Sequence, residues 1–207
     1  MKKLNAFAET MKNHVCTIAF SLTCMFVVFG THAQTADKKN VLLKVVIIRH
    51  GEKPDNGDNL SCAGLNRALA LPAVLDTVVG KPDYTYVPTI GTGDKKTTSV
   101  RMFQTVTPFA VQQNLTINSK YNETDTTGAA KDVLKKRGVV LMVWEHTNIP
   151  GLARNLKVKG NLSWSGKDFD SIWIIEYTKL DSKGNLKSPT LTIEQENITP
   201  TDTCPGQ

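Results

Sequence analysis

Two runs of apolar residues, rich in β-branched side chains, constrain this chain most, because each of them ends close to a histidine. Residues 41–48 (VLLKVVII) lead directly into Arg49 and His50, and residues 139–144 (VVLMVW) are followed, one residue later, by His146. Apolar side chains at successive positions predict strands that are buried on both faces of a mostly parallel sheet. Ligands bind at the carboxyl ends of such strands, so we expect both histidines at one edge of the sheet.

The rest of the chain alternates predicted helices with predicted strands. Helices are expected over residues 61–79, 98–112, 129–136 and 150–155, the first with a kink at Pro72. Further strands are expected over residues 84–90, within 115–123, and over 171–177 and 189–193, the last two joined by a turn at 181–184. Alternation of this kind predicts an α/β fold, a three-layer sandwich with helices on both faces of the sheet.

The N-terminus has the order of a secretory signal peptide. Residues 1–33 combine a basic start, an apolar run over 15–30 and a small-residue cleavage site, which predicts an exported protein, periplasmic or secreted. An uncleaved membrane anchor is the alternative, but the run is short and has no basic cluster on its far side. After cleavage we expect a flexible segment over 34–40, one domain over 41–207 and no stable membrane insertion.

The charge of the mature chain fits a small anionic ligand better than a nucleic acid. The net charge of +6 falls to +4 after cleavage, because the leader contains three lysines and one glutamate. A mild positive balance, without a basic stripe and interleaved aromatic residues, argues against a nucleic-acid partner.

Two of the four cysteines remain in the mature chain. Cys62 and Cys204 form an even pair in a compartment that we expect to be oxidising, so they are candidates for a disulfide. Two free thiols are the alternative, because a sequence does not show proximity.

The residues around His50 are suited to phosphoryl transfer. A neutral imidazole nitrogen is a nucleophile toward phosphorus, and Arg49 offers forked donors to the oxygens of a phosphoryl group. Gly51 lets the backbone approach a ligand closely. The reaction needs mainly positioning and charge stabilisation, so these residue types suffice if further cationic donors converge on them.

Four motifs, in order along residues 42–177, resemble the histidine phosphatase superfamily in its phosphoglycerate-mutase-like branch. The RHGE motif lies at residues 49–52, and the L(S/T)xxGxxRA segment covers 60–68. The RxxQT helix motif covers 101–105, and the second histidine of the family corresponds to His146, with an asparagine two residues later. The resemblance implies the phosphoglycerate-mutase-like α/β fold.

The resemblance also implies a role for each matching residue. His50 is similar to the nucleophile that becomes phosphohistidine, Arg49 and Arg101 to the arginines that bind the phosphoryl oxygens, and His146 to a second donor to these oxygens. The candidate substrate-binding residues are Gly51, Glu52 and Asn148. We expect no metal or other cofactor, and a small phosphorylated substrate as the partner.

The proton donor of such a reaction is not settled by the sequence. Glu145 precedes the second histidine, where the family often has a small residue, and it is a candidate proton donor or orienting residue; a surface salt bridge is the alternative. Glu123 and Asp125 lie where larger members of the family place an acidic residue, but the surrounding motif is absent and the composition favours polar turn-forming residues there. Members without a donor suit good leaving groups such as phosphohistidine.

These observations together predict an exported phosphatase that hydrolyses a phosphomonoester or a phosphohistidine through a covalent phosphohistidine on His50. Two alternatives stay open: a mutase that returns the phosphoryl group to its substrate, and a non-catalytic module that binds phosphate or another anion on the same scaffold.

Overall fold

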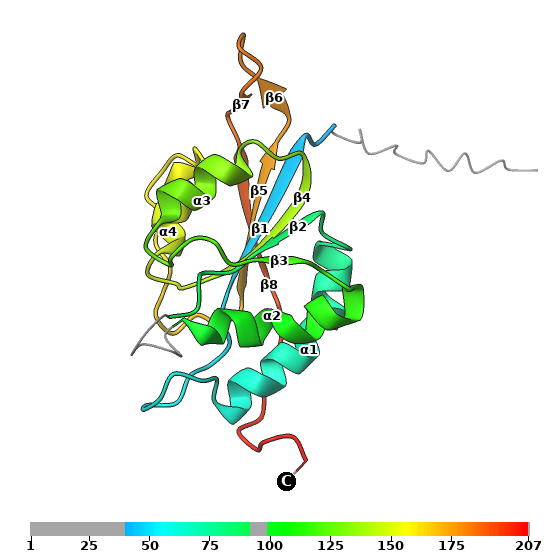
Figure 1. The fold of residues 1–207 in the computed structure, drawn as a ribbon, viewed down its shortest axis with the longest axis vertical. Coiled ribbons are helices and arrows are strands. Elements are labelled where there is room, and N and C mark those ends of the chain that lie inside the picture. The colour runs from blue at the N-terminus through cyan, green and yellow to red at the C-terminus, as the bar shows by residue number, and fades with distance from the viewer. Residues whose placement is uncertain (1–39, 92–98, 207) are drawn as a thin grey trace, which may run out of the picture. The chain divides into compact units, whose positions relative to one another are not determined.

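A six-stranded sheet forms the centre of the structure, a computed structural model that describes residues 40–91 and 99–206 (Figure 1). Its strands, in spatial order, are β3 (Ile117–Asn118), β2 (Tyr84–Tyr86), β4 (Gly138–Trp144), β1 (Leu43–Arg49), β5 (Ser171–Tyr177) and β8 (Thr190–Gln195). The first four are parallel to one another, β5 is antiparallel to β1, and β8 is antiparallel to β5. The predicted mostly parallel sheet is confirmed.

Helices cover both faces of the sheet, as the α/β sandwich requires. Helices α1 (Cys62–Val78) and α2 (Val100–Gln113) lie on one face, and α3 (Thr126–Val133) and α4 (Ile149–Asn155) on the other (Figure 1). Strand β1 serves both layers, because alternate side chains point to opposite faces. Val46 and Ile48 pack with Leu71, Leu75 and Phe109 of the first helical layer. The other face of β1 packs against α3 and α4, which completes the three layers.

Some element bounds differ from the predictions for identifiable reasons. Strand β2 ends at Tyr86 rather than Ile90, because Pro88 lacks the N–H that a ladder needs. Helix α3 begins earlier than predicted, because the Asp125 carboxylate accepts a hydrogen bond from the Gly128 N–H (2.8 Å) and caps the helix. The predicted turn at 181–184 lies in a small hairpin of β6 (Lys179–Leu180) and β7 (Leu186–Lys187).

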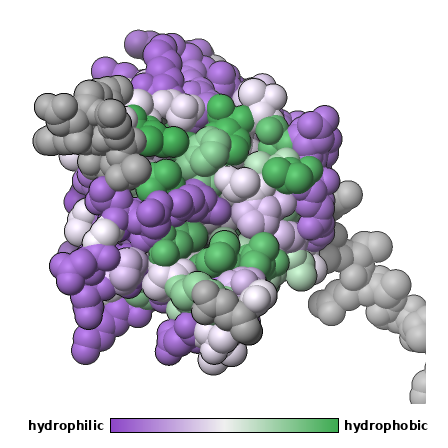
Figure 2. Space-filling model, turned by 60° about the horizontal axis from the view of Figure 1, so that its bottom comes forward, coloured by the Kyte–Doolittle hydropathy of each residue, from purple (hydrophilic) through white to green (hydrophobic). Residues whose placement is uncertain are grey.

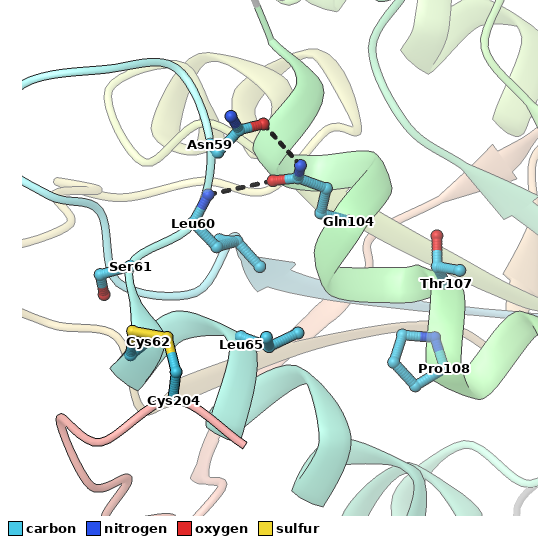
Figure 3. Close-up of a pocket in the computed structure, with 9 residues that line it drawn as sticks. All are labelled: Asn59, Leu60, Ser61, Cys62, Leu65, Gln104, Thr107, Pro108 and Cys204. Atoms are coloured by element: carbon cyan, nitrogen blue, oxygen red, sulfur yellow. Dashed lines mark hydrogen bonds between the residues drawn. A yellow bond between two sulfur atoms is a disulfide. The ribbon is translucent and has the colours of Figure 1, made fainter. Parts of the chain in front are cut away.

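The C-terminal tail is tied to the start of α1. A disulfide joins Cys62 to Cys204, and the Asn66 side chain donates hydrogen bonds to the Thr201 and Thr203 carbonyls (2.8 and 2.7 Å). The bond lies beside an apolar hollow of about 330 Å³, across which Leu65 of α1 and Pro108 of α2 lie (Figure 3). Figure 2 brings this end of the molecule forward and shows apolar side chains among polar ones.

The predicted signal peptide over residues 1–33 lies outside the described residues, as does most of the 34–40 segment. Among the residues that are described, we find no helix with the length and hydropathy needed to cross a bilayer.

Candidate active site

The carboxyl ends of β1 and β4 bring the two predicted histidines to one place. The two strands pair in parallel with Arg49 opposite Trp144, so the residues that follow, His50 and Glu145 with His146, emerge side by side. They line a pocket of about 250 Å³. Its lining residues are Arg49, His50, Lys53, Asp58, Ser99, Arg101, Met102, Glu123, Glu145, His146 and Thr147.

His50 is buried, with 1% of its surface exposed, and both of its ring nitrogens have partners. Its Nδ1 lies 2.6 Å from the Gly51 carbonyl oxygen, and its Nε2 lies 2.8 Å from Glu145 Oε2. A carbonyl oxygen only accepts hydrogen bonds, so Nδ1 carries a hydrogen and Nε2 is the ring atom left for chemistry. Phe169 packs edge-on against the ring, with the ring centroids 6.1 Å apart. The backbone and Phe169 therefore fix the orientation of the imidazole.

Glu145 lies between the two histidines. One carboxylate oxygen contacts His50 Nε2 and the other contacts His146 Nδ1. Burial acts to raise the pKa of Glu145, but the hydrogen bond from His50 and the positive charges of His50, His146 and Arg49 lower this pKa to about 2. Glu145 is therefore a carboxylate at neutral pH, and a carboxylate accepts hydrogen bonds only. In this arrangement both nitrogens of His50 donate.

Arg49 is held in place by two carbonyls and one aromatic ring. Its Nη1 donates to the carbonyls of Gly166 (2.8 Å) and Asp168 (3.0 Å), and its guanidinium lies 3.7 Å from the centre of the Phe169 ring. Its Nε is buried, yet it has no hydrogen-bond partner among the described residues. A buried donor without a partner calls for an explanation, and an anionic ligand in the pocket supplies one.

Arg101 reaches the pocket from the first turn of α2. Its Nη1 donates to the Gly57 carbonyl (3.1 Å), which ties the helix to the loop after His50. The helix begins at Ser99, whose backbone is left-handed (φ 66°) and whose hydroxyl donates to Glu123 Oε2 (2.7 Å). Arg49, Arg101, His50 and His146, which the sequence predicts to act together, thus all line one pocket.

Three predicted substrate-binding residues lie outside the residues that line this pocket. Glu52 forms an ion pair with Arg67 (2.8 Å), and the N–H of Gly51 donates to Thr105 Oγ1 (2.9 Å). A Cβ on Gly51 would lie 2.8 Å from the Gly64 carbonyl oxygen, so close packing against α1 explains this glycine. Asn148 stands at the start of α4. None of the three lines this pocket, and their part in binding a substrate stays a prediction.

Residues of the second and third motifs also hold the segment that follows His50 in place. Gln104 accepts a hydrogen bond from the Leu60 N–H (3.0 Å) and donates to the Asn59 side chain (2.7 Å), as Figure 3 shows. The Thr105 hydroxyl accepts the hydrogen bond from the Gly51 N–H, and Arg67 forms the ion pair with Glu52. Motif position alone does not distinguish residues that touch a ligand from residues that hold the loop.

Several lining residues were missed by the sequence reasoning. Lys53 and Thr147 follow the two histidine motifs directly, so adjacency to these motifs was a usable signal. Asp58, Ser99 and Met102 come from loops and a helix start, where no period or motif marks them.

His50, Glu145 and His146 also form a group whose donor atoms lie within 4.8 Å of one another, the type of cluster that can hold a metal ion. These donors are already paired with each other, and the cations Arg49, Lys53 and Arg101 line the same pocket. These cations favour an anion beside the cluster, although the carboxylates of Asp58 and Glu123 line the same pocket.

Comparison with known proteins places the fold. No family model and no curated protein matches the chain. Among solved structures, the protein histidine phosphatase SixA complexed with tungstate matches with a TM-score of 0.51 at 13% identity, over 74% of this chain and 97% of that one. A mycobacterial glucosyl-3-phosphoglycerate phosphatase in complex with inorganic phosphate matches with a TM-score of 0.51 at 12% identity, over 75% and 99%. This chain therefore shares the α/β phosphoglycerate-mutase-like fold of these two phosphatases.

Proposed function

We propose that the chain is a phosphatase that hydrolyses a phosphomonoester or a phosphohistidine through a covalent intermediate on Nε2 of His50. The observation that carries the proposal is the orientation of His50. Its Nδ1 is held by the Gly51 carbonyl at 2.6 Å, so Nε2 is the nitrogen that faces the pocket. In the first half-reaction a bond forms from Nε2 to phosphorus and the bond to the leaving oxygen breaks. In the second, water takes the phosphoryl group and the nitrogen–phosphorus bond breaks.

The charges around Nε2 suit a phosphoryl group. Arg49 offers its unpartnered Nε, Arg101 and Lys53 line the same pocket, and His146 is a further donor. Such donors stabilise a transition state best when they are held in position before the reaction, and Arg49 is fixed by two carbonyls and Phe169. Two of the solved structures that share this fold hold tungstate and inorganic phosphate, which are oxyanions of the same kind.

Purified chain tested with para-nitrophenyl phosphate decides between this proposal and its alternatives. The aryl leaving group needs no proton, so turnover is expected whatever the proton donor is. Wild-type-like turnover by a His50→Ala variant would overturn the mechanism. Binding of vanadate without any turnover would instead identify a non-catalytic anion-binding module. Transfer of the phosphoryl group back to an added alcohol rather than to water would identify a mutase.

We also propose that the chain is exported. The proposal rests on the order of basic, apolar and small residues within 1–33. The disulfide between Cys62 and Cys204 supports it, because disulfides form and persist in oxidising compartments. N-terminal sequencing of the protein from an exporting host is expected to begin near Gln34. A membrane-bound form that retains Met1 or Met11 would contradict export with cleavage.

A further inference from the structure

Glu145 occupies the position that an attacking histidine needs to have free. Its Oε2 lies 2.8 Å from Nε2 of His50, the atom proposed to form the bond to phosphorus. The pairing of β1 with β4 sets this contact, because Arg49 and Trp144 are opposite and the next residue on each strand follows at the same edge. The Glu145 side chain is 18% exposed and lines the pocket, so it can turn toward a ligand.

The contact between Glu145 and Nε2 of His50 is not the reactive arrangement. Nε2 donates its hydrogen to a carboxylate and so has no lone pair to offer to phosphorus. The proton must leave Nε2 before attack, and the group already in contact with it is the Glu145 carboxylate. The incoming phosphoryl group brings negative charge beside this carboxylate, and like charge favours the protonated form of an acid.

We infer that Glu145 is the proton carrier of the reaction, taking the proton from Nε2 of His50 and giving it to the leaving oxygen. This inference rests on the proposed function and adds a catalytic residue to it. Glu123, the other glutamate that lines the pocket, accepts the Ser99 hydroxyl at 2.7 Å on one carboxylate oxygen. No contact between Glu123 and either histidine appears among the residues that the structure describes.

The first half-reaction transfers the phosphoryl group to His50 and a proton to the leaving oxygen. The proton on Nε2 moves to Glu145 Oε2, leaving a neutral imidazole and a carboxylic acid. The Nε2 lone pair forms the bond to phosphorus, and the electrons of the phosphorus–oxygen bond go to the leaving oxygen, which takes the proton from Glu145. Attacking and leaving atoms lie roughly in line across phosphorus, so Glu145 must turn about its side-chain bonds as the phosphoryl group enters.

The second half-reaction returns every group to its starting state. The Glu145 carboxylate takes a proton from water, whose oxygen forms a bond to phosphorus. The nitrogen–phosphorus bond breaks and its electrons return to Nε2. The proton on Glu145 then passes back to Nε2, which restores the imidazolium–carboxylate pair and releases inorganic phosphate. The sum is one phosphomonoester and one water giving one alcohol and one phosphate.

The position of Glu145 also predicts how oxyanions bind. Carboxylate and phosphoryl oxygens compete for the same donors, His50, His146 and Arg49. Removing the carboxylate charge should therefore tighten the binding of vanadate or phosphate, while removing the proton carrier should slow the chemistry. Replacing a residue with a merely structural role would both weaken oxyanion binding and slow the chemistry.

The test compares Glu145→Gln with Glu123→Gln and with Glu194→Gln, an exposed residue of β8, as matched exchanges of a carboxylate for an amide. Single-turnover and burst kinetics are measured with glycerol phosphate, a poor leaving group, and with para-nitrophenyl phosphate. For Glu145→Gln we expect the first half-reaction of the alkyl substrate to slow by about 100- to 10,000-fold, the range of general acid catalysis. The aryl substrate should still give a burst of about one equivalent of nitrophenolate, because without the carboxylate the Nε2 proton can pass to solvent and nitrophenolate leaves unprotonated. Slower turnover should follow the burst.

The vanadate inhibition constant of Glu145→Gln should fall several-fold, and neither control variant should show the split between substrates. Equal slowing of both substrates in the first half-reaction, or weaker vanadate binding in a folded Glu145→Gln protein, would overturn the inference. A wild-type burst and phosphohistidine on His50 would leave the proposed function standing in that case. A wild-type protein without turnover or phosphoenzyme would instead remove the proposed function itself.

Discussion

The two sides of the segment 49–52 differ in how their hydrogen-bonding groups are used. On the pocket side, Arg49 keeps a buried donor without a partner among the described residues, and Nε2 of His50 contacts the carboxylate of Glu145, which itself lines the pocket. On the opposite side, Gly51 is packed against α1, and Glu52 is bound by three hydrogen bonds from Arg67. One short motif therefore carries both the reacting groups and the anchor that holds them.

The anchor side carries a dense network of hydrogen bonds around Arg67. Arg67 donates to Glu52, Glu196 and Asp170 and to the Ile198 carbonyl, so it joins the His50 loop to the C-terminal tail. Such a network stabilises the loop and holds it in position, whereas a buried donor without a partner is available to a ligand. Changes on the pocket side should thus alter the chemistry with the fold intact, and changes on the anchor side should alter stability first.

The largest effect is expected at His50. His50→Ala should abolish turnover of para-nitrophenyl phosphate, because no other group replaces Nε2 as the nucleophile. His146→Ala, which removes one donor, should lower turnover by about 100- to 1,000-fold, the usual cost of losing one such donor. Steady-state kinetics separate the two, with circular dichroism to confirm folding. Equal residual activity of the two variants would remove the distinction between nucleophile and donor.

Arg101 should show the next largest effect. Arg101→Ala removes a cation from the pocket and should lower turnover by about 100- to 1,000-fold while weakening vanadate inhibition. Arg154→Ala, an exposed arginine of α4, is the matched control and should change neither quantity. An Arg101→Ala enzyme with normal turnover and normal vanadate inhibition would show that Arg101 does not bind the phosphoryl group.

On the anchor side, Arg67→Ala should act on stability more than on chemistry. Its side chain is 5% exposed, and its loss leaves the Glu52 carboxylate and the buried carboxyl group of Glu196 without their shared partner. Breaking a buried ion pair in this way costs about 3–5 kcal/mol of the free energy of unfolding. Denaturant titration measures this, with exposed Arg137→Ala as control. Unchanged stability together with lost turnover would mean that Arg67 takes part in the reaction instead.

The smallest effect on turnover is expected from the disulfide. Replacing both Cys62 and Cys204 with Ser should cost about 2–5 kcal/mol of the free energy of unfolding, because the bond closes a loop across 142 positions. Turnover at moderate temperature should stay near wild type, since neither cysteine lines the pocket. Two titratable thiols in unreduced wild-type protein would contradict the bond.

The sequence predicts the parts of the site that lie at the ends of the two buried strands. Residues 41–48 and 139–144 read as buried strands, and parallel pairing alone brings His50 and His146 to one edge. The contributions of loops were not predictable: nothing periodic shows that Phe169 stacks on Arg49 or that Arg101 binds the Gly57 carbonyl.

Glu145 shows where sequence reasoning stops. Its place before His146 suggested an orienting residue, a proton donor or a surface salt bridge, and only the register of β1 against β4 brings its carboxylate to Nε2. Glu52 and Asn148 lie outside the lining of the pocket, and their motif positions do not tell which way their side chains face. Side-chain direction at the end of a strand depends on the packing of loops that carry no period of their own.

Trapping the phosphoenzyme tests the central claim most directly. Wild-type protein is mixed with labelled para-nitrophenyl phosphate, denatured within the first turnovers, digested at alkaline pH and mapped by mass spectrometry. The account predicts one acid-labile phosphoryl group per chain, on His50, absent from His50→Ala and accumulating in Glu145→Gln. Turnover without any phosphorylated residue, or a phosphoryl group on a residue other than His50, would contradict it.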